Sequence, residues 1–191
     1  TNEINRLLIM DMLTKRAMKN RLPVLVAAQK VANELLTLRP KVDADDGKLT
    51  LQKEMVEMSK KIGLLVAGAA VQKYMMKLAD PEQEDIVALI SNIVIEVFAM
   101  ESGLLRALKT MEKPEDEKSQ IKKAMVKVYV NDAFNRVESF AKQAFAAIAE
   151  GDILRTQLSA LKKLTRFTPV NTIGLRREIA DSVIKMGRYP F

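Results

Sequence analysis

Apolar side chains recur every three or four residues along most of the chain, and this spacing predicts helices rather than strands. The pattern is most regular between residues 86 and 111, where steps of four and three residues alternate over more than three heptads: Ile86, Ile90, Ile93, Val97, Met100, Leu104, Ala107 and Met111. A heptad pattern of this length is typical of a helix that packs lengthwise against other helices. The sequence therefore predicts an all-α fold, an antiparallel, up-and-down bundle of long helices.

Proline, glycine and polar residues divide the chain into seven predicted helices. They cover about 2–18, 23–36, 49–78, 81–111, 114–150, 152–164 and 171–186. We expect Asp80 and Asp152 to cap the helices that follow them, and Gly151 and Gly187 to end helices. The connection before Pro81 is short, which predicts that the two helices it joins are antiparallel neighbours. The turn-rich stretch TLRPKVDADDGK at 37–48 is the best candidate for a boundary between two structural units.

Two further features are best explained by core packing. The apolar run IGLLVAGAAV at 62–71 has about half the length that crosses a bilayer, so we interpret it as a buried helix whose small residues allow a neighbouring backbone to approach closely. The 11 methionines suggest a copper site or an adaptable peptide groove. Several of them occupy apolar-face positions, however, and we therefore expect Met55, Met58, Met76, Met100 and Met111 to fill the core.

The chain has 191 residues and contains neither cysteine nor histidine. Disulfides, thiolate metal sites and the histidine-containing sites of di-iron bundles are therefore excluded, as is the commonest general base. No P-loop or paired-glycine nucleotide motif is present, because Gly63 and Gly68 lie within a predicted helix. We expect no metal site, and composition and spacing alone predict a helical bundle of undetermined function.

The net charge of +7 is concentrated at the C-terminal end. Residues 153–191 contain eight Lys or Arg and two acidic residues, a composition that suits nucleic acid, an anionic membrane surface, an acidic partner or simply a solvated helix surface. The segment lacks the interleaved aromatic residues that stack on single strands and has no zinc-finger or RNA-recognition signature, so we do not expect a nucleic-acid partner. A helix-turn-helix around FTPVNTIG stays open as an alternative.

The opening residues TNEINRLLI resemble a motif of acyl-CoA dehydrogenases. In that family an aromatic residue, the catalytic Glu, Gly and Thr are followed by a polar pair, Ile and usually Arg, and Thr1, Asn2, Glu3, Ile4 and Arg6 match this order. The resemblance places the catalytic Glu and the Gly immediately before Thr1. It therefore implies that residues 1–191 contain no catalytic residue.

The rest of the chain, from about Leu51 to Phe191, is similar to the additional C-terminal helical domain of very-long-chain acyl-CoA dehydrogenases. The similarity rests on LQKEMVEMSKKIGLLVAGAAVQKYMM and on the closing PVNTIGLRREIADSVIKMGRYPF. It implies three parts: residues 1–36 as the end of the helical catalytic domain, residues 37–48 as a linker, and residues 49–191 as the additional bundle.

The resemblance also implies a function for a longer parent protein. The parent would be an FAD-dependent oxidoreductase of fatty-acid β-oxidation that desaturates acyl-CoA between the α and β carbons, whereas this fragment alone would be inactive. Thr1, Asn2 and Glu3 would contact FAD, or alternatively only cap the first helix. Implied partners are acyl-CoA and electron-transfer flavoprotein, a second copy in a homodimer, and a membrane surface through 153–191. The implied location is the bacterial cytoplasm, peripheral to the membrane.

A different class of protein stays open beside this one. A free-standing basic helical module that binds an acidic partner or nucleic acid would explain both the charge and the bundle, although it leaves the opening motif unexplained.

Overall fold

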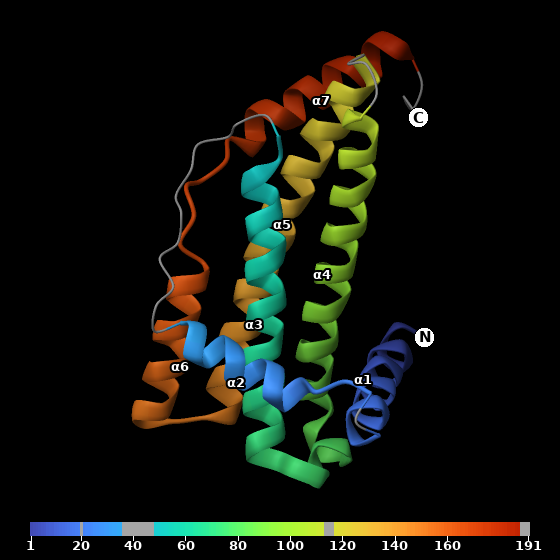
Figure 1. Cartoon of the computed structure of the whole chain (residues 1–191). Helices are drawn as coiled ribbons and strands as arrows, with labels where there is room; N and C mark the ends of the chain where they lie inside the picture. The colour runs from blue at the N-terminus through green and yellow to red at the C-terminus, as the bar shows by residue number, and fades with distance from the viewer. Residues whose placement is uncertain (20, 36–47, 113–116, 188–191) are drawn as a thin grey trace.

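The computed structural model of the chain (Figure 1) describes residues 1–19, 21–35, 48–112 and 117–187, and within these ranges the regular elements are all helical. The main helices are α1 (Asn2–Met18), α2 (Val24–Glu34), α3 (Thr50–Tyr74), α4 (Glu84–Met111), α5 (Glu117–Ile148), α6 (Gly151–Leu164) and α7 (Thr172–Met186). The predicted all-α fold is confirmed. The predicted linker at 37–48, apart from Lys48, and the predicted helix start near Pro114 lie outside the described residues.

The long helices α3, α4 and α5 lie side by side and form the body of the molecule (Figure 1). α3 and α4 run in opposite directions, as the short connection between them predicted. α2 crosses α3, α1 packs on α4, and α6 packs on α5 and α3. α7 lies across one end of the bundle, where it contacts α5 and contributes no buried residue.

The apolar face predicted for α4 lies in the core. Ile86, Ile90, Ile93, Met100, Leu104 and Ala107 are buried, and Val97 and Met111 are half-buried against the same core. Among the described residues, Pro81–Met111 is also the one helical segment long and apolar enough to cross a membrane, because it contains an 18-residue stretch with a mean hydropathy of 1.7. This segment packs against α1, α3 and α5 and carries the ion-paired Glu96 and Glu101, so we describe it as a bundle helix.

The connection between α3 and α4 differs from the prediction of one helix over 49–78. α3 ends at Tyr74 because Met75 has a non-helical backbone conformation, with a φ of 49° and a ψ of −124°, which interrupts the α-helical hydrogen bonds. Two short 3-10 turns follow, Met75–Ala79 and Pro81–Gln83, and α4 begins only at Glu84. Such turns commonly join helices where the α-helical pattern stops.

Two aspartates predicted to cap helices do not cap them. Asp80 precedes the second 3-10 turn without a side-chain capping hydrogen bond. At α6 the N-cap is Glu150, and Asp152 lies in the first turn, where it is ion-paired with Arg155 at 2.9 Å. Gly151 has the left-handed conformation expected at a helix end, with a φ of 57°, but it is the first residue of α6 because α5 ends earlier.

The predicted close approach of a second backbone occurs at Gly68 in α3. A Cβ atom added there would lie 2.6 Å from the Cβ atom of Ala28 in α2. Ile62, Val66 and Ala70 of the same run are fully buried, which confirms the buried helix predicted over 62–71. The predicted core methionines are buried (Met55, Met100) or half-buried against the core (Met58, Met111), and the Met76 side chain lies outside the described residues.

Candidate functional site

The three residues predicted to contact a cofactor lie at the N-terminal end of α1. Thr1, Asn2 and Glu3 are all exposed. Thr1 occupies the N-cap position, but its side chain makes no capping hydrogen bond, while its carbonyl oxygen accepts the Asn5 N–H at 3.0 Å. The first amide groups of an α-helix have no partner within the helix and carry the positive end of its dipole. This end of α1 is therefore suited to polar or anionic groups of a ligand.

The first turn of α1 is attached to α4 through Arg6. The Arg6 Nε donates to Asn92 Oδ1 at 2.6 Å, and its Nη1 is ion-paired with Glu3 Oε1 at 2.6 Å. The Ser91 hydroxyl, which is fully buried, donates to the Arg6 carbonyl oxygen at 2.6 Å. The sequence motif included Arg6, but no local pattern identified Ser91 or Asn92, because they lie more than 80 positions along the chain from Arg6.

The two faces of α1 differ in their surroundings. Met10 is buried in the bundle core, and Leu7 and Leu13 pack partly against it. On the other face Ile4, Leu8 and Met12 follow one another at four-residue intervals with exposed fractions of 68%, 51% and 45%. An exposed apolar stripe of this kind is typical of a surface that contacts another part of a protein.

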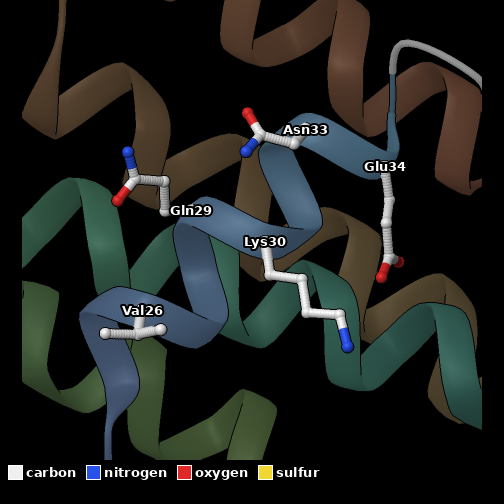
Figure 2. Close-up of a pocket in the computed structure, with 5 residues that line it drawn as sticks. All are labelled: Val26, Gln29, Lys30, Asn33 and Glu34. Atoms are coloured by element: carbon white, nitrogen blue, oxygen red, sulfur yellow. The ribbon is translucent and has the colours of Figure 1, made fainter.

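A hollow of about 510 Å³ lies beside α2 (Figure 2). All five lining residues belong to this helix: Val26, Gln29, Lys30, Asn33 and Glu34. Glu34 is ion-paired with Lys61 of α3 at 2.9 Å, and the hydrogen bond from Lys61 lowers the pKa of the Glu34 carboxyl. The lining brings together no nucleophile and base, and we therefore do not consider it an active site.

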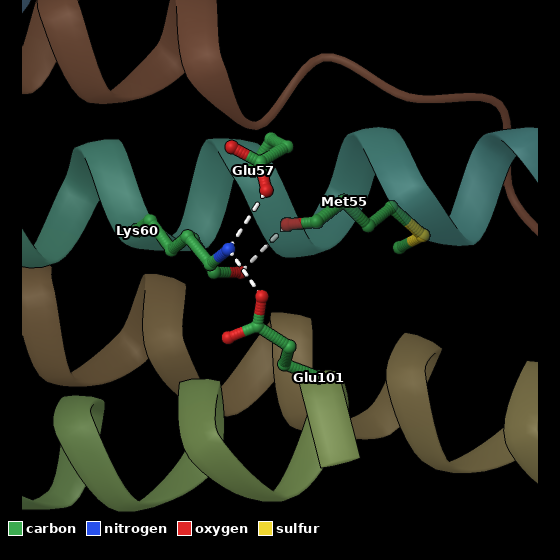
Figure 3. A network of polar contacts seen from close by, with 5 residues as sticks. Met55, Glu57, Lys60 and Glu101 are labelled. Carbon is green, nitrogen blue, oxygen red and sulfur yellow. Dashed lines mark hydrogen bonds and ion pairs between the residues drawn. The ribbon is translucent and has the colours of Figure 1, made fainter. Parts of the chain in front are cut away.

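Charged groups between α3 and α4 form a structural network (Figure 3). Lys60 Nζ is 2.6 Å from Glu101 Oε1 and 2.8 Å from Glu57 Oε1, and Ser59 nearby donates to the Met55 carbonyl oxygen at 2.8 Å. Desolvation has the largest single effect on the pKa of Lys60 and lowers it. The hydrogen bonds with the two carboxylates outweigh desolvation, and the pKa is raised overall. The network joins two core helices and has no geometry for catalysis.

A second charged group joins α4 to α5. The Arg136 guanidinium donates to both oxygens of Glu96, at 2.6 and 2.9 Å, and the Tyr129 hydroxyl lies 3.2 Å from the same carboxylate. The hydrogen bonds with Glu96 raise the pKa of Arg136, and desolvation raises the pKa of Tyr129. Among the described residues, no group of three or more carboxylates is placed to hold a metal ion.

The basic C-terminal segment is described as far as residue 187 and consists of α6, an extended connection and α7. Lys162, Lys163, Arg166 and Arg177 are exposed, as are the apolar side chains of Ile153, Leu158, Ile173 and Ile184. Arg176 is ion-paired with Asp132 of α5 at 2.5 Å. The segment thus presents basic and apolar side chains together.

The helix-turn-helix alternative around FTPVNTIG is wrong. α6 packs beside α5 and α3 toward one end of the bundle, whereas α7 crosses the opposite end (Figure 1). The connection between them keeps its place along the bundle partly through Phe167, whose ring lies edge-on to Phe134 with centroids 5.1 Å apart. A helix-turn-helix needs two helices that meet at a tight turn, and these two do not meet.

Comparison with known proteins gives consistent matches along the chain. Residues 58–163 match the family model described as acyl-CoA dehydrogenase, C-terminal domain. A protein of Bacillus subtilis (strain 168) described as a probable acyl-CoA dehydrogenase is 42% identical over 189 residues, which are 99% of this chain and 31% of that protein. The crystal structure of an acyl-CoA dehydrogenase complexed with FAD from Bacillus anthracis is 42% identical, with a TM-score of 0.92 over 100% of this chain and 32% of that one. The chain spans about a third of the length of these relatives.

Proposed function

The chain belongs to the family of acyl-CoA dehydrogenase C-terminal domains, and from that premise we propose that it is the C-terminal helical part of an FAD-dependent acyl-CoA dehydrogenase of fatty-acid β-oxidation. The observation that carries the proposal is the similarity of the whole chain to the FAD-complexed enzyme of B. anthracis, at 42% identity and a TM-score of 0.92. The parent reaction would desaturate an acyl-CoA between its α and β carbons.

In this reaction a carboxylate base removes the α proton while FAD accepts the β hydride. A carboxylate suits the role because a desolvated pocket raises its pKa toward neutrality. We propose that this carboxylate lies in the part of the parent protein that precedes Thr1. Because the proposed base lies outside residues 1–191, this chain alone is expected to be inactive.

Thr1, Asn2 and Glu3 are proposed to contact FAD in the parent protein. Their exposure and the position of Thr1 at an N-cap without a side-chain hydrogen bond support this role. A helix N-terminus offers backbone N–H donors to the oxygens of the cofactor, while the exposed Glu3 carboxylate, already ion-paired with Arg6, is less suited to an anionic group.

The remaining helices are proposed to have a supporting role. We assign α1 and α2 to the end of the catalytic domain and α3–α7 to an additional domain. The exposed Ile95, Phe98 and Leu105 of α4, with exposed fractions of 42%, 72% and 58%, suit contact with a second copy in a homodimer. The basic and apolar surface of α6 and α7 suits peripheral contact with an anionic membrane. The proposed location is the bacterial cytoplasm, at the membrane surface. Acyl-CoA and electron-transfer flavoprotein would bind the parent.

The proposal is tested by expressing the full-length parent protein and this chain in parallel. The full-length protein is expected to be yellow, to contain FAD and to lose its flavin absorbance when a long-chain acyl-CoA is added without oxygen. The 191-residue chain is expected to be colourless and inactive. A full-length protein that binds no FAD would overturn the proposal and favour a basic helical interaction module.

A further inference from the structure

We infer that Ser91 and Asn92 of α4 are positioning residues for the proposed flavin site. Through Arg6 they hold the first turn of α1, which carries Thr1, Asn2 and Glu3, against the bundle. The inference rests on the proposed function and adds to it a role for two residues that make no contact with a cofactor.

The geometry restrains this turn in two independent ways. The Ser91 hydroxyl reaches the backbone carbonyl oxygen of Arg6 at 2.6 Å, so it fixes the position of the helix backbone rather than of a mobile side chain. Asn92 accepts from the Arg6 guanidinium at 2.6 Å, and the same guanidinium contacts Glu3 at 2.6 Å. One contact holds the backbone of α1, and the other holds the Arg6 side chain that also contacts Glu3.

The contacts with α4 are more buried than the outer ion pair between Arg6 and Glu3. Ser91 is fully buried, and the Arg6 side chain is only 27% exposed, whereas Glu3 is 78% exposed. Water therefore competes weakly for the contacts at α4 and freely for the outer ion pair. The path from the core to the flavin-facing end of α1 consists of Ser91 and Asn92, then Arg6, then Glu3.

The expected effect of breaking the path is on flavin binding more than on folding. Loss of these contacts lets α1 adopt orientations that do not bind the cofactor, and the apparent dissociation constant rises as the inverse of the fraction of molecules that stays competent. We expect a rise of about fivefold when either contact is removed, and of about thirtyfold when both are removed.

The experiment compares variants of the full-length protein. Ser91→Ala and Asn92→Leu remove the donor and the acceptor, and Asn92→Asp keeps an acceptor for Arg6. Ser59→Ala is a matched control, because Ser59 is as fully buried as Ser91 but its hydroxyl bonds to Met55 within α3, away from α1. For each variant we would measure the dissociation constant of FAD from the apoprotein, the visible spectrum of the bound flavin and the unfolding temperature.

Support would be weaker FAD binding in Ser91→Ala and Asn92→Leu, with binding retained in Asn92→Asp and in Ser59→Ala at similar unfolding temperatures. Equal weakening in Ser59→Ala would overturn the inference, because the effect would then be general destabilisation. Unchanged binding in both α4 variants, in a protein that does contain FAD, would also overturn it while leaving the proposed function intact. A wild-type protein without FAD would refute the proposed function, and this inference with it.

Discussion

The contact between α2 and α3 at Gly68 gives the sharpest prediction of stability. We expect Gly68→Ala to destabilise the fold, although alanine is the better helix former by about 1 kcal/mol. The new Cβ atom would lie 2.6 Å from the Cβ of Ala28, about 1 Å closer than an ordinary carbon contact. The Ala28 methyl group has no side-chain torsion that moves it away, so the backbone of α2 has to shift.

The magnitude follows from two opposing effects. Overpacking of a close helix contact costs about 1–3 kcal/mol, and the helix preference of alanine offsets about 1 kcal/mol of that. The net expectation is a loss of up to about 2 kcal/mol in the free energy of unfolding. Gly103→Ala in α4 is the control, because its Cβ atom would meet Val126 at an ordinary 3.9 Å. This variant is expected to be stabilised by about 0.5–1 kcal/mol.

The assay is urea unfolding followed by far-ultraviolet circular dichroism, with the free energy taken from the midpoint and slope. A third variant, Gly68→Ala combined with Ala28→Gly, moves the methyl group from one helix to the other and is expected to recover part of the loss. Equal stabilisation by Gly68→Ala and Gly103→Ala would refute the close packing of α2 on α3 at Gly68. If the double variant recovers no stability, Ala28 is not the residue that the added methyl group meets.

Three further predictions concern charged residues. The pKa of Glu34 is lower in the folded state than its ordinary value of 4.5, so its contribution to stability is present above pH 4.5 and is lost as the pH falls through the folded value. The urea midpoint of Glu34→Gln should therefore depend less on pH below 4.5 than that of the unchanged protein, and an equal dependence would contradict the ion pair with Lys61. The pKa of Lys60 is raised above 10.5, so its contribution is present below that pH and lost as the pH rises through the folded value. Glu101→Gln should therefore lower the free energy of unfolding by about 0.5–1 kcal/mol at neutral pH and have little effect in strong alkali, as a pH series of urea titrations will reveal. Reversing the charge of the exposed Lys162 and Lys163 to Glu should abolish co-sedimentation with phosphatidylserine vesicles at low salt, since each basic residue contributes about 1 kcal/mol to membrane binding. Binding that persists in this variant would show that the basic surface of α6 does not contact the membrane.

Regular parts of the fold were predictable because their signals are local. The heptad pattern of α4 identified the residues that the structure buries, and Asn171 and Gly187 lie at the ends of α7 as expected, with Asn171 Oδ1 accepting the Gly174 N–H at 3.0 Å. The 3-10 turns after Tyr74 were missed, because Met, Lys and Leu all favour helix and only the positive φ of Met75 in the structure shows the interruption. Asp152 was assigned as a cap from residue type alone, although the cap position belongs to Glu150.

The candidate site was predictable only in part. The order of residues from Thr1 to Arg6 suggested a cofactor contact, which stays a prediction. The attachment of that turn to Ser91 and Asn92 depends on how α1 packs against α4, and no spacing within either helix encodes it. The exposed apolar stripe of α1 was equally hidden, because an apolar face looks the same in sequence whether the chain itself covers it or leaves it exposed.

The way α7 lies across the bundle end has a consequence for local unfolding. None of its described side chains is buried, and Arg176 supplies an ion pair to Asp132 of α5 at the surface. A helix held by so little buried apolar area opens at a small fraction of the free energy needed to unfold the core. Its amide hydrogens should therefore exchange with deuterium while those of α3, α4 and α5 stay protected, so the basic end of the molecule can rearrange on a surface without disturbing the rest.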